Sequence, residues 1–442
     1  MPIQLSEHFT YSKLLRFTLP SVIMVIFTSI YSVIDGLFVS QFVGETPFAA
    51  VNIIWPFIMI LGAIGFMFGS GGSALVAKTL GEGRIFKANR IFSLLIYATL
   101  ILGSTFAVCG LLFIKPLVAA FGVEGVLLDE CMVYASILLP AVPMLMLQVI
   151  FQQFMSTAAR PKLGLIITVV AGVANFGLDA LFIIVWQWGV AGAAWATAAS
   201  QIIGAVVPLL YFIFPNKSLL HLGKTRFYFS ALLKSASNGV SEFVSNISMS
   251  VVCMLYNYQL LRIVGEDGVV AYGIISYVTF IFWAAFIGYT IGSNPIVSFH
   301  FGAENKKELQ SLWRKSLFLI TISGVILTLL AELFAIPIAA VFIGYDDELT
   351  EMTAIGFRIY ALSFLFAGFN IYASGFFTAL NNGLISATIA LMRTLIFECL
   401  CVLILPIFFG LNGIWCAIIV AEILAFIVSF GFFFKLKKRY GY

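Results

Sequence analysis

Residues 94–114 read LLIYATLILGSTFAVCGLLFI, a stretch without a single charged side chain. As an α-helix it is about 30 Å long, which matches the hydrocarbon core of a bilayer. Runs of this kind recur along the whole 442-residue chain, which has 62% hydrophobic and 10% charged residues and a mean hydropathy of +1.07. A soluble domain carries about 25% charged residues, and a transmembrane β-barrel alternates apolar and polar residues. The sequence therefore predicts an all-α integral membrane protein.

Twelve such runs are expected to span the membrane, six in each half of the chain. An N-lobe (residues 1–213) and a C-lobe (231–442) are joined by the longest polar connection, the inter-lobe loop 214–230. Residues 1–17 lack the basic start and cleavage site of a secretory signal, so they are interpreted as a polar lead into the first span. The predicted spans are residues 14–43, 48–77, 91–114, 131–158, 164–186, 191–214, 235–264, 269–299, 316–343, 353–380, 385–409 and 411–434.

The basic residues predict the orientation of these spans. Of the 24 Lys and Arg residues, 20 fall in the two terminal segments and the even-numbered connections, all of which lie on one side of the membrane. The opposite connections carry mostly Asp and Glu. Because Lys and Arg accumulate on the cytoplasmic side, we expect a multi-pass protein of the plasma (inner) membrane with both termini cytoplasmic.

The two halves match at an offset of 221 residues. Lys13 then pairs with Lys234, Gly71 with Gly292, and Gly81 with Gly302. Six spans is an even number, so both halves enter the membrane in the same direction. The expected architecture is two six-helix bundles related by a pseudo-two-fold axis along the membrane normal, which is typical of carriers with a central cavity.

Four polar residues stand out within the N-lobe spans: Asp35, Asn175, Asp179 and Thr197. Asp35, Asp179 and Thr197 are expected about 8–13 Å below the outer surface, at about 1.5 Å per residue, and Asn175 is expected one turn below Asp179. Inserting a charged side chain at such a depth costs roughly 2.5–3.5 kcal/mol, so a functional or structural role is expected for it. Carboxylate, amide and hydroxyl oxygens suit a proton or a small hard cation, and burial beside a second carboxylate favours a protonated form. The alternative is a structural hydrogen-bond network between spans one, five and six.

Other intramembrane polar residues are candidates for a substrate path. Arg393 and Glu398 lie five positions apart, about 140° around a helix, so they are poor partners for each other. Gln148 and Gln152 form a polar stripe that helix–helix hydrogen bonding explains equally well. Pro20 should kink the first span and is a candidate hinge. The path candidates are Tyr31, Gln148, Gln152, Glu242, Arg393 and Glu398, with Glu332 and Glu422 as further options.

The chain resembles the multidrug and toxic compound extrusion (MATE) family. The likeness is carried by LPSVIMVIFTSIYSVIDGLFVSQFVG in span one, by NFGLDALFIIVWQWGVAGAAWATAASQI in spans five and six, and by the turns LVAKTLGEGR and IVSFHFGAEN. It is most similar to the prokaryotic branch that includes the DNA-damage-inducible and staphylococcal multidrug-pump subgroups. Asn175, Asp179 and Thr197 match the N-lobe cation site of that branch, with Asp35 as the span-one partner.

The resemblance implies export of amphipathic, often cationic, organic compounds in exchange for inward H⁺ or Na⁺. It also implies that Asp35 binds the coupling ion and that the first span bends at Pro20 when Asp35 is protonated. Another branch of the family keeps its key carboxylates in the second lobe. Here Tyr256 and Leu400 stand at the positions equivalent to Asp35 and Asp179. Glu242 and Glu398 are the second-lobe carboxylates that could substitute.

Two other functions fit the sequence less well. A flippase for lipid-linked precursors or other amphiphiles would need several basic residues in its cavity, and only Arg262, Arg358 and Arg393 are available. An intramembrane enzyme would need aspartate-rich metal motifs or a nucleophile with a base. The chain has no Walker-type loop, and its histidines and cysteines predict no metal site. We therefore expect a protein that is not an enzyme. It is expected to function as a monomer, with membrane lipid and small organic substrates as partners and without nucleic acid. No cofactor is expected besides the coupling ion, H⁺ or Na⁺.

Overall fold

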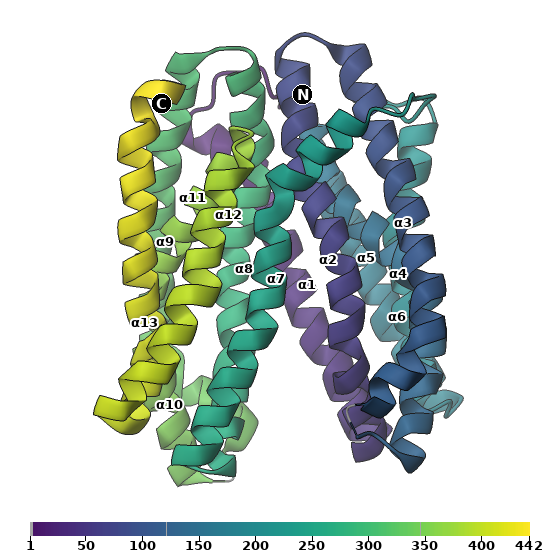
Figure 1. Cartoon of the computed structure of the whole chain (residues 1–442), viewed down its shortest axis with the longest axis vertical. Coiled ribbons are helices and arrows are strands. Elements are labelled where there is room, and N and C mark those ends of the chain that lie inside the picture. Colours follow the sequence, from purple (N-terminus) through teal and green to yellow (C-terminus); the bar gives the residue numbers. More distant parts are fainter. Residues whose placement is uncertain (1–2, 121, 345) are drawn as a thin grey trace.

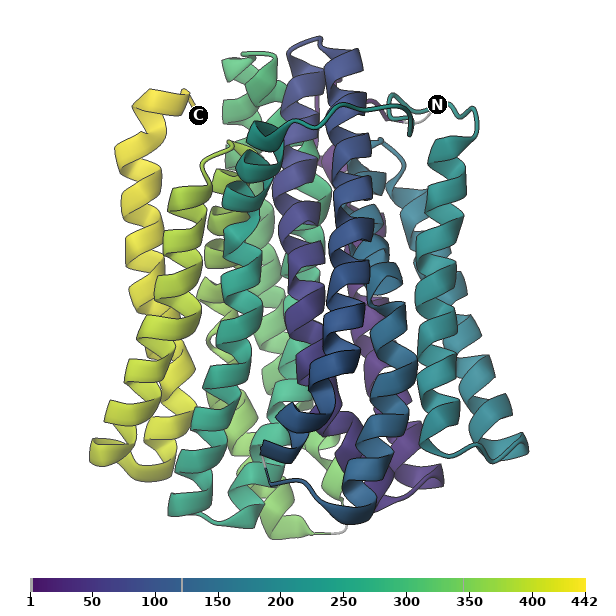
Figure 2. The same ribbon diagram turned by 45° about the vertical axis from the view of Figure 1, so that its right-hand side comes forward.

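The structure, a computed structural model, describes residues 3–120, 122–344 and 346–442. These residues form long helices joined by short turns. Figure 1 shows them in two groups that stand side by side, α1–α6 and α7–α13, with both chain termini at the same end of the molecule. We call this end the terminal end. Figure 2, turned by 45°, shows the same lengthwise arrangement of the helices.

The described residues of the first half form six helices and one π-helical turn. They are α1 (Tyr11–Phe42), α2 (Glu45–Gly81), α3 (Ile85–Ala120), α4 (Gly125–Thr157), α5 (Pro161–Asp179), η1 (Ala180–Val185) and α6 (Val190–Ile213). The second half repeats the order with two interruptions. It contains α7 (Phe229–Ile263), α8 (Glu266–Gly302), α9 (Lys306–Ile343), α10 (Asp347–Ala361), α11 (Phe364–Ala379), α12 (Gly383–Leu391), η2 (Met392–Phe397) and α13 (Glu398–Tyr440).

These helices account for the twelve predicted spans. Within the described residues, ten helices are long and apolar enough to cross a membrane, and α10 with α11 forms an eleventh when this bent pair counts as one span. The continuous stretch Gly383–Tyr440 has non-helical backbone at Gly410 (φ 55°, ψ −133°). It therefore contains the last two predicted spans, which meet at this glycine.

Most helices extend beyond the predicted spans, and α9 shows why. We expected this span to start at residue 316, but the helix begins at Lys306. The side chain of Asn305 accepts a hydrogen bond from the N–H of Glu308 and so caps the first turn. Lys, Glu and Gln are good helix formers outside the membrane, so a hydropathy boundary marks the edge of the bilayer rather than the end of the helix.

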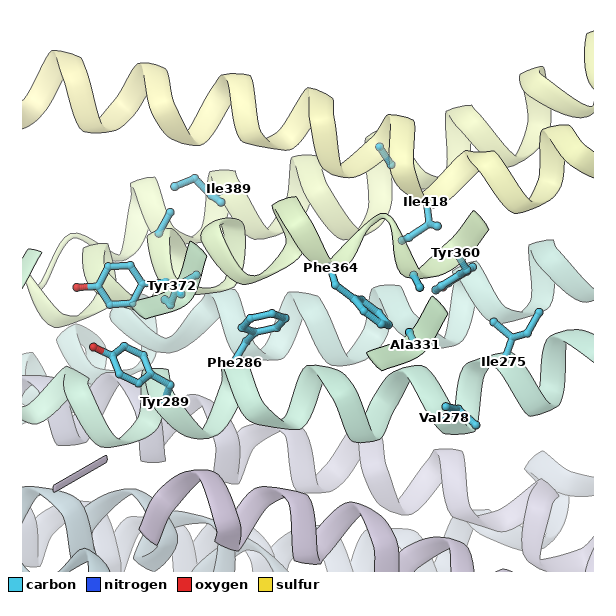
Figure 3. Close-up of a cluster of buried hydrophobic side chains, with 14 of the residues drawn as sticks. Ile275, Val278, Phe286, Tyr289, Ala331, Tyr360, Phe364, Tyr372, Ile389 and Ile418 are labelled. Atoms are coloured by element: carbon cyan, nitrogen blue, oxygen red, sulfur yellow. The ribbon is translucent and has the colours of Figure 1, made fainter. Parts of the chain in front are cut away.

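Apolar side chains of the second half form the largest hydrophobic core. Figure 3 shows Phe286, Phe364 and Ile389 between the ribbons, with Tyr289 and Tyr372 side by side. The rings of these two tyrosines are 6.2 Å apart, and the Tyr289 hydroxyl donates to Ser316 at 2.8 Å. The Tyr289 hydroxyl thus keeps a partner within the bundle, whereas the buried Tyr372 hydroxyl has no hydrogen-bond partner among the described residues.

The two halves meet at the terminal end through closely packed glycines. A Cβ atom on Gly81 of α2 would lie 2.0 Å from the carbonyl oxygen of Phe299. A Cβ on Gly302 of α8 would lie 2.1 Å from the carbonyl oxygen of Lys78. Lys78 and Phe299 are themselves equivalent under the 221-residue offset, so the contact is symmetric. Only glycine permits helices to approach this closely.

The N-terminal segment is more than the polar lead that the sequence suggested. Leu5 and Phe9 are buried, and Phe9 contacts the ring of His300 from the other half. The carboxylate of Glu308 on α9 accepts hydrogen bonds from the Phe9 N–H at 2.9 Å and pairs with His8 at 2.6 Å. The segment therefore attaches the beginning of α1 to the second half of the molecule.

Candidate functional site

Close packing of α1 against α5 builds the candidate site of the first half. A Cβ atom on Gly172 of α5 would lie 2.5 Å from the ring of Phe27 and 3.1 Å from the ring of Tyr31, both on α1. A larger residue at position 172 would separate the two helices. Asn175 and Asp179 follow on α5, one and two turns beyond Gly172, and Asp35 follows Tyr31 by one turn on α1.

The structure brings Asp35, Asp179 and Asn175 together. The side chain of Asp35 lies close enough to those of Asp179 and Asn175 for the three groups to interact. Asp179 is 1% exposed and Asn175 is 3% exposed, whereas Asp35 is half-buried. The π-helical turn η1 begins directly after Asp179, and such turns often occur at functional sites.

Several oxygens of the four predicted site residues have no hydrogen-bond partner among the described residues. They are Oδ1 of Asp35, Oδ1 of Asp179 and Oγ1 of Thr197 on α6, and all three are buried. A buried polar atom without a partner costs about 1–3 kcal/mol, and a pair of carboxylates in close contact adds mutual repulsion. A proton shared by the two carboxyl groups, or a small cation ligated by their oxygens, would relieve both costs.

Tyr31, Gln148 and Tyr134 form the surroundings of the two carboxyl groups. The Tyr31 hydroxyl lies close to the side chain of Gln148 on α4 and is near enough to Asp35 to interact with it electrostatically. Tyr134, also on α4, is 1% exposed and is close enough to interact electrostatically with both aspartates. Sequence reasoning missed Tyr134. Its spacing of 14 residues from Gln148, close to four helical turns, is the signal that could have revealed it.

The remaining first-half candidates lie outside this contact set. Gln152 is half-buried one turn after Gln148. Pro20 is buried within α1, which is helical on both sides of it. Because Pro20 has no N–H, the carbonyl group of Arg16 loses its helical partner there. The hydroxyl groups of Ser21 and Ser156 are 3.1 Å apart and hold this part of α1 against α4.

A second polar cluster lies in the second half. Nε of Arg393 is 2.7 Å from Oε1 of Glu422, and Nδ2 of Asn370 donates to Oε2 of Glu422 at 2.7 Å. The Arg393 guanidinium lies over the ring of Trp283, 5.0 Å from its centroid. Glu398 is 7% exposed and interacts electrostatically with Arg393 and Glu422.

This cluster shows which acidic residue pairs with Arg393. The helical spacing made Glu398 a poor partner for Arg393, and the ion-pair partner is Glu422, 29 residues further along the chain. Elsewhere in the second half, Glu332 of α9 is 3.9 Å from Arg358 of α10. The side chain of Glu242 on α7 makes no ion pair or hydrogen bond with the described residues, and only its backbone carbonyl accepts from Asn246.

Comparison with known proteins assigns the chain to a family. The MatE family pattern matches residues 20–181 and residues 243–403, which together are most of the chain. This chain belongs to the MATE transporter family. The two matched segments fall at corresponding places in the two halves, in agreement with the internal repeat. The resemblance seen in spans one, five and six is thus confirmed, and the protein is a membrane transporter rather than an enzyme.

Relatives of this MATE protein cover its full length. It is 24% identical to the multidrug export protein MepA of Staphylococcus haemolyticus, over 98% of this chain and 95% of that protein. Its fold is similar to that of a multidrug resistance MATE family transporter in an outward-facing conformation, with a TM-score of 0.93, 21% identity and coverage of 99% and 97% of the two chains. A MATE protein in complex with MaL6 matches with a TM-score of 0.94 at 21% identity, over 99% and 98%.

The buried ion pair of this MATE protein predicts an effect on stability. We expect Arg393→Leu to lower the free energy of unfolding by about 3–5 kcal/mol, because it leaves Glu422 buried without its cation. The double variant Arg393→Leu/Glu422→Gln should recover most of this loss, since the amide still accepts from Asn370 and the buried charge of Glu422 is removed. Thermal unfolding in detergent measures both. A single variant as stable as the parent would mean that the pair contributes nothing.

Proposed function

We propose that this MATE protein is a secondary active multidrug efflux transporter, which exports amphipathic cationic organic compounds in exchange for H⁺ or Na⁺. One observation carries the proposal: two carboxyl groups and an amide from α1 and α5 meet in a buried position, with carboxyl oxygens that lack a hydrogen-bond partner among the described residues. The names of the staphylococcal relatives, which are multidrug export proteins, support the same class of substrate.

In the proposed mechanism, the coupling ion acts on α1. When Asp35 and Asp179 are both ionised, their repulsion favours separation of α1 from α5, and an ion bound between them favours contact. The two arrangements are two states of the transporter, and the ion shifts the balance only because it binds them unequally. Pro20 divides α1 between the site and the terminal end, so we propose that α1 bends there.

The positive-inside pattern supports a cytoplasmic position for the terminal end. The glycine contacts between α2 and α8 hold the two halves together at that end. We therefore propose that the N-lobe and the C-lobe move as units, and that the conformation described here is closed toward the cytoplasm.

Proteoliposomes with imposed ion gradients test this function. Uptake of a fluorescent lipophilic cation, such as ethidium, is measured under a pH gradient alone and then under a Na⁺ gradient alone. We expect one of the two ion gradients to drive the probe against its own concentration gradient. For comparison, a membrane potential of 100 mV supplies about 2.3 kcal/mol per charge moved. Liposomes without protein are the control. Probe movement that neither gradient alters would contradict ion-coupled export.

The arginine contacts do not favour the flippase alternative. Arg393 pairs with Glu422, and Arg358 lies 3.9 Å from Glu332. A cavity that binds a large anionic head group would present these cations to the ligand rather than to acidic neighbours.

A further inference from the structure

A large hollow lies at the terminal end of the first half. It encloses about 1010 Å³ between the beginning of α1, the beginning of α5, the end of α6 and the loop that follows α6. Four basic side chains line it: Arg16, Arg160, Lys162 and Lys217. No carboxylate is among its described lining residues.

The rest of the lining is mostly apolar and faces outward. Ile166 of α5 and Val207 and Leu210 of α6 are 57%, 43% and 45% exposed. In a helix bundle of a membrane protein, such exposed apolar side chains contact lipid tails. The hollow thus combines an apolar wall toward the bilayer with a cationic margin at the membrane surface.

The positive-inside rule alone does not explain this arrangement. That rule accounts for basic residues at the terminal end, some with acidic neighbours (Lys13 pairs with Glu7 at 2.6 Å, and Glu82 lies within 4 Å of both Lys78 and Arg84) and others without. It does not require four of them to line one hollow beside an apolar wall. Within the described residues, the four cations of the hollow have no acidic partner. Arg160 instead donates to the carbonyl oxygen of Lys217 at 3.1 Å, which holds the loop against α5.

We propose that the hollow binds one anionic glycerophospholipid from the surrounding leaflet. Its phosphate and head group would pair with Arg16, Lys162 and Lys217, because charged hydrogen bonds to phosphate are the strongest that these side chains can form. An acyl chain would lie along Ile166 and Leu210. Basic pockets between membrane helices recognise anionic head groups in this way, and a zwitterionic lipid would leave the excess positive charge uncompensated.

The bound lipid would link three segments of the first half. Arg16 lies one turn before Pro20 on α1, while Lys162 is on α5 and Lys217 is on the loop after α6. A shared phosphate group therefore ties the part of α1 on the terminal side of Pro20 to its neighbours. This lipid site is independent of the proposed coupling site and goes beyond the proposed function.

Lipid binding to the purified full-length protein in uncharged detergent tests the proposal. Native mass spectrometry and thermal unfolding are measured with added phosphatidylglycerol, phosphatidylcholine or inorganic phosphate. The variant Arg16→Gln/Lys162→Gln/Lys217→Gln removes three charges from the hollow and keeps Arg160. The matched control Lys224→Gln/Lys435→Gln/Lys438→Gln removes three charges elsewhere at the terminal end.

We expect one tightly bound phosphatidylglycerol in the parent and in the control variant. Affinity in the hollow variant should fall roughly fivefold for each charge removed, or about 100-fold in total. If that variant does not fold, Lys217→Gln in the loop should still show the fivefold loss. Equal binding of phosphatidylcholine, equal stabilisation by inorganic phosphate, or equal losses in the hollow and control variants would each overturn the proposal.

Discussion

Replacing Asp35 with Asn is expected to abolish substrate-driven ion movement. The change keeps the size of the side chain and its ability to form hydrogen bonds with Asn175 and Asp179, but the residue can no longer gain or lose a proton or contribute a full negative charge to a cation. The measurement is ion flux evoked by substrate in proteoliposomes, which should fall to the level of protein-free liposomes.

This substitution separates the two interpretations of the buried pair. If Asp35 and Asp179 form only a structural hydrogen-bond network, the amide maintains it and flux remains at the parent level. If the pair binds the coupling ion, flux is lost while substrate binding and thermal stability remain. Asp129→Asn, the same chemical change at an exposed position of α4, is the matched control and should transport normally.

The double variant Gly81→Ala/Gly302→Ala is expected to shift the balance between the closed and open states of the terminal end. Each new Cβ atom would lie about 2 Å from a backbone carbonyl oxygen of the opposite half, and backbone atoms cannot move aside as a flexible side chain does. Overpacking of this kind costs about 1–3 kcal/mol. We expect this cost to fall on the state in which the terminal end is closed and not on the state in which it is open. The population of the closed state relative to the open state then drops about 5- to 150-fold.

Spin or fluorescent labels on the ends of α2 and α8 would measure this shift as an increase in the distance between the halves, and substrate transport should fall by a similar factor. Gly273→Ala on α8 is the matched control, because a Cβ atom there meets nothing within 4 Å. Alanine is also the better helix former, so the control should be neutral or slightly more stable. Unchanged label distances in the double variant would show that the glycine contacts do not close the terminal end.

The spans and the repeat could be predicted because they depend on local and periodic properties. A run such as residues 94–114 must form a helix in lipid, since every backbone N–H and C=O needs a partner there. The pairing of Gly81 with Gly302 in the sequence also anticipated the fold, although their contact across the two halves appears only in the structure. The helix ends were placed too far inward because hydropathy reports the bilayer edge.

The candidate site was predictable to a similar extent. The cost of desolvating a charge made Asp35 and Asp179 conspicuous, whichever residues surround them. Their neighbours were harder to identify. Tyr134 appears as one more aromatic residue in an apolar helix, and Asn370 as a polar residue of unknown direction, until packing places the first near the two aspartates and the second on Glu422.

The sequence by itself determined that this protein is a helical membrane transporter, built from two similar halves and carrying a few costly charges within its spans. The sequence already predicted that Asp35 and Asp179 share a site, but only the tertiary structure decided that Arg393 meets Glu422. The physical reason is that lipid tails are as apolar as the side chains of the protein interior. No hydrophobic driving force therefore distinguishes the buried face of a membrane helix from its lipid face, and the orientation of each helix is set by close packing and polar contacts between residues far apart in the chain.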